Sequence, residues 1–416
     1  MEYWLLTILR GPKKKYYHYE VGDMKIGIIT FHFVYNCGAA LQCFALQTEL
    51  EKLGHEVCII NYRPWYHQNR YTPLKNPIYF AGKRFREPAR NIGTRCWHAM
   101  DGFIRTVHSW KRYPEIAPRD KKFKKFTSSY LKETPVYRSL KQLQECPPDC
   151  QLYITGSDQL WNRALLGNAF DSAYFLNFGP KGVRRISYSV GADFSNIKDP
   201  VHELETLVKP LDVISLRESK WLSCVDKAAK GAIPIHLDLD PTLLLKAEDY
   251  MQHMADLPPE KEPYILVYSM PGETQKQIYN GARILSETLG IHTIDVSGNP
   301  GQMNKKIKDN RICGPDEFLW YVYHAEYVLT NSFHGTVFSI IFQKKFAVIP
   351  HAVTGNRVTE LLDKLGLASR YYKLTQDAVK GILQNIDYAM VNKKLDQLRN
   401  DSIHFLQNCT DESNNF

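Results

Sequence analysis

The stretch that decides the fold is Lys25-Ile-Gly-Ile-Ile-Thr-Phe31, a short apolar run with β-branched residues, as a buried strand requires. After a short loop, apolar residues from Ala40 to Leu53 recur at mostly three- and four-residue intervals, which predicts a helix that ends at Gly54. The run Glu56-Val-Cys-Ile-Ile-Asn61 predicts the next strand. Strand, helix and strand within about 40 residues form a βαβ unit, the seed of a parallel, doubly wound sheet.

The same alternation continues in two series, with a boundary near 241–263. The further strands are predicted at 152–155, 186–190, 213–216, 264–269, 292–296, 327–330 and 346–349, and the helices at 273–289, 316–324 and 336–342. In open α/β sheets, the loops at the carboxyl ends of the strands line the ligand crevice. We therefore predict an α/β protein with two Rossmann-like domains and a cleft between them.

Length and composition agree with a folded protein of more than one domain. The chain has 416 residues, more than the roughly 100 to 200 of a single domain. Hydrophobic residues make up 44% and charged residues 23%, which excludes a disordered, collagen-like or disulfide-scaffold chain. The predicted parts are an N-terminal extension at 1–23, a first domain at 24–250 with an insertion at about 65–135, a second domain at 260–370, and a helical tail at 371–416.

Membrane spans and structural zinc are not predicted. No apolar run approaches the ~20 residues that cross a bilayer. The nine cysteines are scattered without metal-ligand spacing, which favours reduced thiols in a cytoplasmic protein.

Positive charge is concentrated in the insertion. The whole chain carries 53 − 44 = +9, but residues 65–135 alone hold sixteen Lys/Arg and five Asp/Glu, an excess of 16 − 5 = +11, interleaved with aromatic residues. This mixture suits an acidic surface such as anionic lipid, nucleic acid or a charged glycan. The alternative for the stripe Phe123, Phe126 and Tyr130 is a helix that packs by its aromatic edge and leaves its lysines in solvent.

The strongest local signal for chemistry is Thr330-Asn-Ser-Phe-His-Gly-Thr336, between a predicted strand and an apolar helix. Unpaired backbone N–H groups and the helix dipole make such a junction an anion site, to which His334 would add a proton or a cationic contact. The alternative is that Ser332 merely caps the helix and His334 packs at the domain edge.

Three other loops carry candidate residues. Arg217 follows a strand and would clamp a carboxylate or phosphate, or else pair with Glu218 at the surface. Asp158, on the turn after another strand, would serve as a general acid or base or form a local Asx-turn. The loop Tyr35-Asn-Cys-Gly-Ala39 would approach a ligand closely, but it lacks the Gly-x-Gly-x-x-Gly and Walker patterns of nucleotide sites.

Taken together, these motifs resemble those of the polysaccharide pyruvyl transferase family, in order and spacing, from about Met24 to about Leu367. The residues that carry the resemblance are Lys25-Ile-Gly-Ile-Ile-Thr-Phe-His32, Asn36-Cys-Gly-Ala-Ala-Leu-Gln42, Leu53-Gly-His-Glu-Val57, Ile59-Ile-Asn-Tyr-Arg63, Thr155-Gly-Ser-Asp-Gln-Leu-Trp-Asn162, Ile214-Ser-Leu-Arg-Glu218, Asp240-Pro-Thr-Leu-Leu244 and Asn331-Ser-Phe-His-Gly-Thr-Val-Phe-Ser339. The basic insertion and the last forty or so residues match weakly. Asn331 stands where relatives often have aspartate, and Cys37 where they often have tyrosine.

The resemblance implies a glycosyltransferase-B-like fold and transfer of pyruvate from phosphoenolpyruvate to a sugar, forming a ketal without a metal or nicotinamide. It implies that Arg217 and His334 hold the donor, with a further cation for which we prefer Arg357 to Lys345. We expect His334 and Asp158 to be catalytic. The expected substrate-binding residues are Arg217, Ser332, Gly335, Arg357, Asn36 and Gly38.

The expected partners are phosphoenolpyruvate and a sugar or lipid-linked glycan of a bacterial cell-envelope polysaccharide, with no nucleic acid. Contact with the inner face of the membrane through 65–135 is one interpretation of the basic insertion. Two other functions fit the same sequence: a sugar-nucleotide-dependent glycosyltransferase of the same architecture, and a non-catalytic interaction protein of a glycan pathway.

Overall fold

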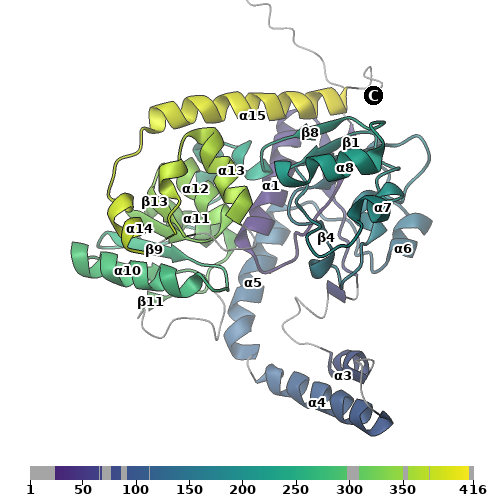
Figure 1. The fold of residues 1–416 in the computed structure, drawn as a ribbon, viewed down its shortest axis with the longest axis horizontal. Coiled ribbons are helices and arrows are strands. Elements are labelled where there is room, and N and C mark those ends of the chain that lie inside the picture. Colours follow the sequence, from purple (N-terminus) through teal and green to yellow (C-terminus); the bar gives the residue numbers. More distant parts are fainter. Residues whose placement is uncertain are drawn as a thin grey trace, which may run out of the picture.

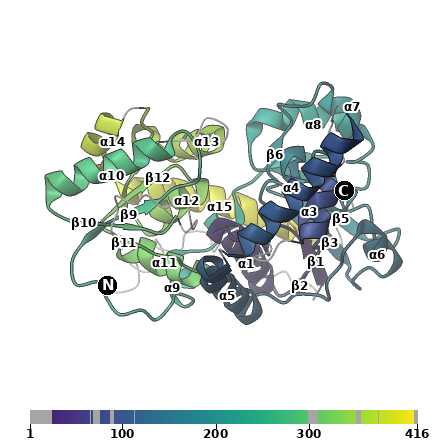
Figure 2. The ribbon, with the colours of Figure 1, turned by 90° about the horizontal axis from the view of Figure 1, so that it is seen from below.

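The computed structural model describes residues 24–64, 66–67, 76–85, 91–111, 113–297, 309–349, 355–373 and 375–411; the predicted extension at 1–23 lies outside them. Figure 1 shows two α/β domains side by side, with the last helix, α15 (Tyr388–Thr410), lying along both. Figure 2 shows the same two domains from below.

The N-terminal domain is built on a parallel sheet with strand order β2-β1-β3-β5. Its strands are β1 (Lys25–Ile29), β2 (Glu56–Ile59), β3 (Leu152–Gly156) and β5 (Arg184–Tyr188), and the helix α1 (Cys37–Lys52) connects the first two. Bridges from Ile186 to Val213 and from Val190 to Leu216 continue the sheet to the pair β7 (Ile214–Leu216) and β8 (Ile235–Leu237). The smaller elements are α6 (Leu140–Glu145), β4 (Trp161–Asn162), β6 (Ala192–Asp193), α7 (Pro200–Glu205), α8 (Leu222–Ala229) and α9 (Ala247–Met251).

The C-terminal domain has a second parallel sheet, of order β11-β10-β9-β12-β13. Its strands are β9 (Tyr264–Tyr268), β10 (His292–Asp295), β11 (Asp309–Asn310), β12 (Tyr327–Thr330) and β13 (Lys345–Val348). Its helices are α10 (Gln275–Leu289), α11 (Pro315–His324), α12 (Phe333–Ile341), α13 (Gly355–Leu365) and α14 (Thr375–Ile382). Two parallel α/β sheets, each with crossover helices, confirm the predicted fold class and its glycosyltransferase-B-like arrangement.

The basic insertion divides into two structurally different parts. Helix α5 (Tyr113–Tyr130) belongs to the body, because Phe123 and Phe126 are buried in the main core while Lys124 stays exposed. The aromatic edge of this helix therefore packs, as the second interpretation of the stripe expected. Helices α3 (Pro77–Phe85) and α4 (Ile92–Trp110) instead pair with one another and project from the body (Figure 1).

Helix α15 connects the two domains after the C-terminal domain is complete. The guanidinium of Arg399 donates from Nε to the carbonyl of Leu243 at 2.9 Å, and Arg184 of β5 donates from Nη1 to the carbonyl of Cys409 at 2.7 Å. Much of the apolar core is likewise shared, since a single cluster runs from Ile28 of β1 to Leu266 of β9. The predicted tail at 371–416 thus includes a helix that returns to the first domain.

Candidate active site

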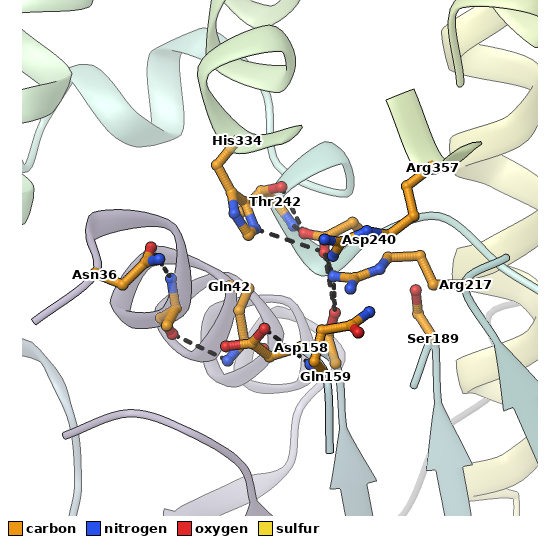
Figure 3. A network of polar contacts seen from close by, with 12 residues as sticks. Asn36, Gln42, Asp158, Gln159, Ser189, Arg217, Asp240, Thr242, His334 and Arg357 are labelled. Atoms are coloured by element: carbon orange, nitrogen blue, oxygen red, sulfur yellow. Dashed lines mark hydrogen bonds and ion pairs between the residues drawn. The ribbon is translucent and has the colours of Figure 1, made fainter. Parts of the chain in front are cut away.

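The site lies where the carboxyl ends of both sheets face one another. Residues that follow β3, β5 and β7 come from the N-terminal domain, and the first turn of α12, which follows β12, comes from the C-terminal domain. Figure 3 shows their side chains converging. This is where open parallel sheets generally bind ligands.

A buried ion pair forms the centre of the site. Arg217 Nη1 lies 2.7 Å from Asp240 Oδ2, and the two side chains are 3% and 0% exposed. Ser157 Oγ donates to the same carboxylate oxygen at 3.0 Å. The other oxygen of Asp240 accepts from the backbone N–H and hydroxyl of Thr242, at 3.1 and 2.6 Å. Asp240 is therefore held rigidly on both oxygens.

His334 reaches the same carboxylate from the C-terminal domain. Its Nε2 lies 3.7 Å from Asp240 Oδ2, an ion-pair distance when the ring is protonated. The opposite edge of the ring packs on α1, because a Cβ added at Gly38 would lie 2.0 Å from His334 Nδ1. The glycine therefore makes room for the histidine. Among the described residues, His334 Nε2 has no hydrogen-bond partner although it is buried.

A second arginine joins the first. Arg357, near the start of α13, lies with its Nε 3.4 Å from Glu218 Oε1, and Arg217 Nε lies 3.4 Å from the same oxygen. Both guanidinium groups stand over the ring of Phe333, 5.1 Å from its centroid for Arg217 and 5.7 Å for Arg357. Arg217 Nη2 is a buried donor without a hydrogen-bond partner in the described part of the chain. Two guanidinium cations therefore lie close together, and the Nη2 donor of Arg217 is available to a ligand.

The pKa values of the charged side chains in the site are shifted by burial and by their contacts with one another. Burial alone would lower the pKa of Arg217, but the carboxylates of Glu218 and Asp240 raise it above its ordinary value. Burial would raise the pKa of Asp240, yet His334 and then Arg217 hold it well below its usual range. Burial lowers the pKa of Arg357, and the cation of Arg217 lowers it further. Arg217 is therefore held in place by the Asp240 carboxylate, which keeps its charge.

Four of the sequence-predicted residues have local structural contacts. The Oδ1 atom of Asp158 accepts from the N–H of Gln159 at 2.8 Å, on a turn where Asp158 has a φ of 69°. Asn36 caps α1 and Ser332 caps α12 through their side chains. Gly335 packs on β12, because a Cβ there would lie 2.3 Å from Thr330 Oγ1.

The alternative third cation lies elsewhere. Lys345 is the first residue of β13, at the amino end of that strand, and its Nζ stands 5.6 Å from the ring centroid of Tyr327. Of the two residues considered, only Arg357 contacts the group around Arg217.

Helix α12 begins earlier than predicted, and this determines where His334 points. The sequence suggested a start at Thr336, but the helix starts at Phe333 because Ser332 is its N-cap. His334 therefore belongs to the first helical turn rather than to a loop. Asn331 is fixed beside it: Oδ1 accepts from the N–H of Met270 at 2.6 Å, and Nδ2 donates to the carbonyl of Met270 at 3.0 Å. An aspartate could not make the second bond.

Sequence reasoning missed Asp240 as a site residue. The motif Asp240-Pro-Thr-Leu-Leu244 contributes to the family resemblance, but the sequence alone indicates no partner for its carboxylate. A signal was present, because aspartate before proline at the start of a short helix is a typical N-cap, and Asp240 does cap the 3₁₀ turn Pro241–Leu243. Only the fold shows that its second oxygen meets Arg217 and His334.

Two negative findings apply to the described residues. None of their helices is long and apolar enough to cross a membrane. No group of three or more His, Cys, Asp or Glu side chains within them is placed to hold a metal ion.

This chain was compared with curated proteins, with solved structures and with protein-family models. A search of curated proteins finds no match. Solved structures that resemble this chain include a putative UDP-N-acetylglucosamine 2-epimerase from Listeria monocytogenes, with 9% identity, 91% of each chain covered and a TM-score of 0.48. Another is the UDP-GlcNAc 2-epimerase of Neisseria meningitidis bound to UDP-GlcNAc, with 11% identity, 92% of this chain and 99% of that one covered, and a TM-score of 0.46. The model of the polysaccharide pyruvyl transferase family matches residues 36–352, about three quarters of the sequence, so this chain belongs to that family.

Proposed function

We propose that this protein transfers pyruvate from phosphoenolpyruvate to two hydroxyls of a sugar in a polysaccharide or its precursor, forming a ketal. The observation that carries the proposal is the convergence of Arg217, Arg357 and His334 at the domain boundary, in a chain of this family. Two of these side chains have a buried donor atom without a hydrogen-bond partner among the described residues, Arg217 Nη2 and His334 Nε2.

The charges suit the donor. Phosphoenolpyruvate carries a carboxylate and a phosphate, and guanidinium groups bind both kinds of anion with paired hydrogen bonds. Asp240 already occupies Nη1 of Arg217, which leaves Nη2 for the ligand. The N-terminal turn of α12 adds the positive end of a helix dipole.

In the proposed reaction, His334 delivers a proton to the methylene carbon of phosphoenolpyruvate, which leaves a cationic centre on the neighbouring carbon. One sugar hydroxyl attacks that carbon and loses its proton, and Asp158 orients or deprotonates it. The carbon–oxygen bond to phosphate then breaks. The second hydroxyl closes the ketal, and its proton leaves with the phosphate. Asp240 stabilises the protonated His334 before transfer.

The test measures phosphate release from phosphoenolpyruvate, and pyruvylated product by mass spectrometry, with a mixture of glycan acceptors. Arg217→Ala and His334→Ala should each lose activity by at least roughly 10²-fold. Arg283→Ala, on the exposed face of α10, is the matched control and should behave as wild type. Full activity in both site variants would remove the site assignment. Calorimetry that detects a UDP-sugar and not phosphoenolpyruvate would favour the glycosyltransferase alternative instead.

A further inference from the structure

Helix α4 has one packed face and one partly exposed apolar face. Gly102 and Thr106 are buried, and Gly102 lies against α3, where an added Cβ would lie 3.1 Å from Arg84 and from the carbonyl of Phe80. The other face carries Trp97, Met100, Phe103, Ile104, Val107 and Trp110, which recur at three- and four-residue spacing and are 37–56% exposed. We call these six residues the α4 stripe.

The concentration of exposed apolar residues in this part of the chain is unusual. Of the fourteen exposed large apolar side chains in the described residues, nine lie between Ile78 and Tyr113. Figure 1 shows the α3–α4 pair projecting from the two domains rather than lying against either sheet. Contiguous apolar surface of this kind marks an interaction site more often than chance exposure.

The positive charge of the α3–α4 region indicates which kind of surface the α4 stripe would contact. The described parts of this region, 76–85 and 91–111, contain five Lys/Arg and one Asp/Glu, an excess of 5 − 1 = +4. Arg105, next to Ile104 in the sequence, is 73% exposed on its side chain, although its Nε also pairs with Asp101 at 2.7 Å. An apolar face with tryptophans at both ends and basic residues around it is typical of helices that lie in the interface of an anionic bilayer. A second copy of the chain would bring like charge against like charge.

We propose that the α4 stripe docks this protein on the surface of an anionic lipid bilayer. The apolar side chains enter the boundary between head groups and acyl chains, and the basic residues contact the lipid phosphates. Helix α4 lies on the surface and does not span it.

The docking helix is connected to the site through α5. Tyr35, next to the Asn36 cap of α1, donates its hydroxyl to Asp120 of α5 at 2.6 Å, and Arg119 of α5 donates from Nη2 to the Tyr35 carbonyl at 2.8 Å. A protein docked through α4 would hold its site near the membrane surface, where a lipid-linked acceptor resides. The docking itself does not depend on the proposed pyruvyl transfer.

The test is co-sedimentation of the full chain with vesicles of phosphatidylcholine alone or mixed with phosphatidylglycerol, at low and high salt. No donor or acceptor is added, so the result is separate from the enzymatic proposal. Wild type should bind the mixed vesicles at low salt, bind them less at high salt, and bind neutral vesicles weakly. The double variant Met100→Glu/Ile104→Glu should bind at least roughly tenfold more weakly, because it places two anions on the inserted face.

Met390→Glu is the matched control, since Met390 is 58% exposed, close to the 56% of Met100, but lies on α15. It should bind as wild type. Absence of wild-type binding to anionic vesicles at low salt overturns the proposal, as does unchanged binding of the double variant. Light scattering gives a further criterion: a dimeric wild type that the double variant converts to a monomer would make the stripe a chain–chain interface, and the membrane proposal would fail.

Discussion

At the scale of single residues, Asp240 connects the two domains at the site. One carboxylate oxygen lies 2.7 Å from Arg217 Nη1 and 3.7 Å from His334 Nε2, so the charge of one residue positions two others from different domains. Removing one member of a buried group of charges leaves the other charges uncompensated. The folding free energy that is lost is then larger than the loss for an exposed ion pair.

Asp240→Asn should lower the free energy of unfolding by roughly 3–5 kcal/mol and reduce pyruvyl transfer, because Arg217 and His334 lose their shared anion. Urea unfolding and phosphate release measure the two effects. Asp238→Asn is the control: Asp238 Oδ2 accepts from Ser215 Oγ at 2.7 Å, and burial raises the pKa of Asp238, so a neutral side chain should cost about 1 kcal/mol or less. Equal losses in the two variants would contradict a special role for Asp240.

The contribution of Asp240 to stability should depend on pH in one direction. Its pKa is depressed in the folded state, so its contribution is complete above the pKa of an unfolded aspartate, about 4, and is lost as pH falls below that value. The difference in unfolding free energy between wild type and Asp240→Asn should therefore shrink as the pH falls below about 4, where the imidazole of His334 no longer titrates. A difference that grows below about pH 4 would mean that the pKa of Asp240 is raised.

Gly38→Ala should displace the His334 ring, because the added Cβ would lie 2.0 Å from Nδ1. Displacements of this size cost roughly 10²-fold in rate when the displaced group is catalytic. Gly82→Ala, on α3, meets nothing within 4 Å and should leave pyruvyl transfer unchanged. If Gly38→Ala kept wild-type activity, His334 would not act from the position described.

At the scale of elements, the local patterns predicted the apolar strands of both sheets, but they predicted neither the short strands β8 and β11 nor the arrangement of the site. Apolar runs such as 25–31 and 264–269 predicted β1 and β9 because a buried parallel strand is apolar throughout. The joint position of Asp240 and His334 could not be predicted, since 94 residues separate them and only the packing of two domains brings them together. Likewise the charge of 65–135 did not show that α5 packs while α4 projects.

Arg399→Ala should weaken the attachment of α15. Arg399 is 7% exposed and donates from Nε to the Leu243 carbonyl at 2.9 Å, so alanine leaves a buried carbonyl without this donor, at a cost of roughly 1–3 kcal/mol in urea unfolding. Arg283→Ala, at an exposed pair with Glu287 on α10, should change stability by no more than about 0.5 kcal/mol. Equal effects would show that α15 contributes little through this contact.

At the scale of the whole molecule, one of the three apolar clusters of the described residues is shared by the two domains, while each domain also closes a cluster of its own. The cluster that contains Ile28 and Ile154 of the first sheet also contains Leu266 and Val328 of the second. Independent domains would each close their own core and meet through a more polar interface. The shared cluster therefore makes the domains depend on one another.

We expect the domains to unfold together in one transition. Far-UV and near-UV circular dichroism during urea unfolding should give coincident curves, because exposure of either sheet opens the common cluster. Two separated transitions would show that each domain is stable without the other.

The return of α15 also has a consequence for how the protein is made. Phe405 packs near Tyr188 of β5, with ring centroids 6.1 Å apart, and Arg184 holds the carbonyl of Cys409. The first domain therefore needs residues that the ribosome adds after the second domain. Domains usually fold as units in the order of synthesis, but here the first must wait with an apolar face uncovered. Full burial of the first domain is then delayed until α15 emerges from the ribosome, and chaperones would have most access to this chain just before that point.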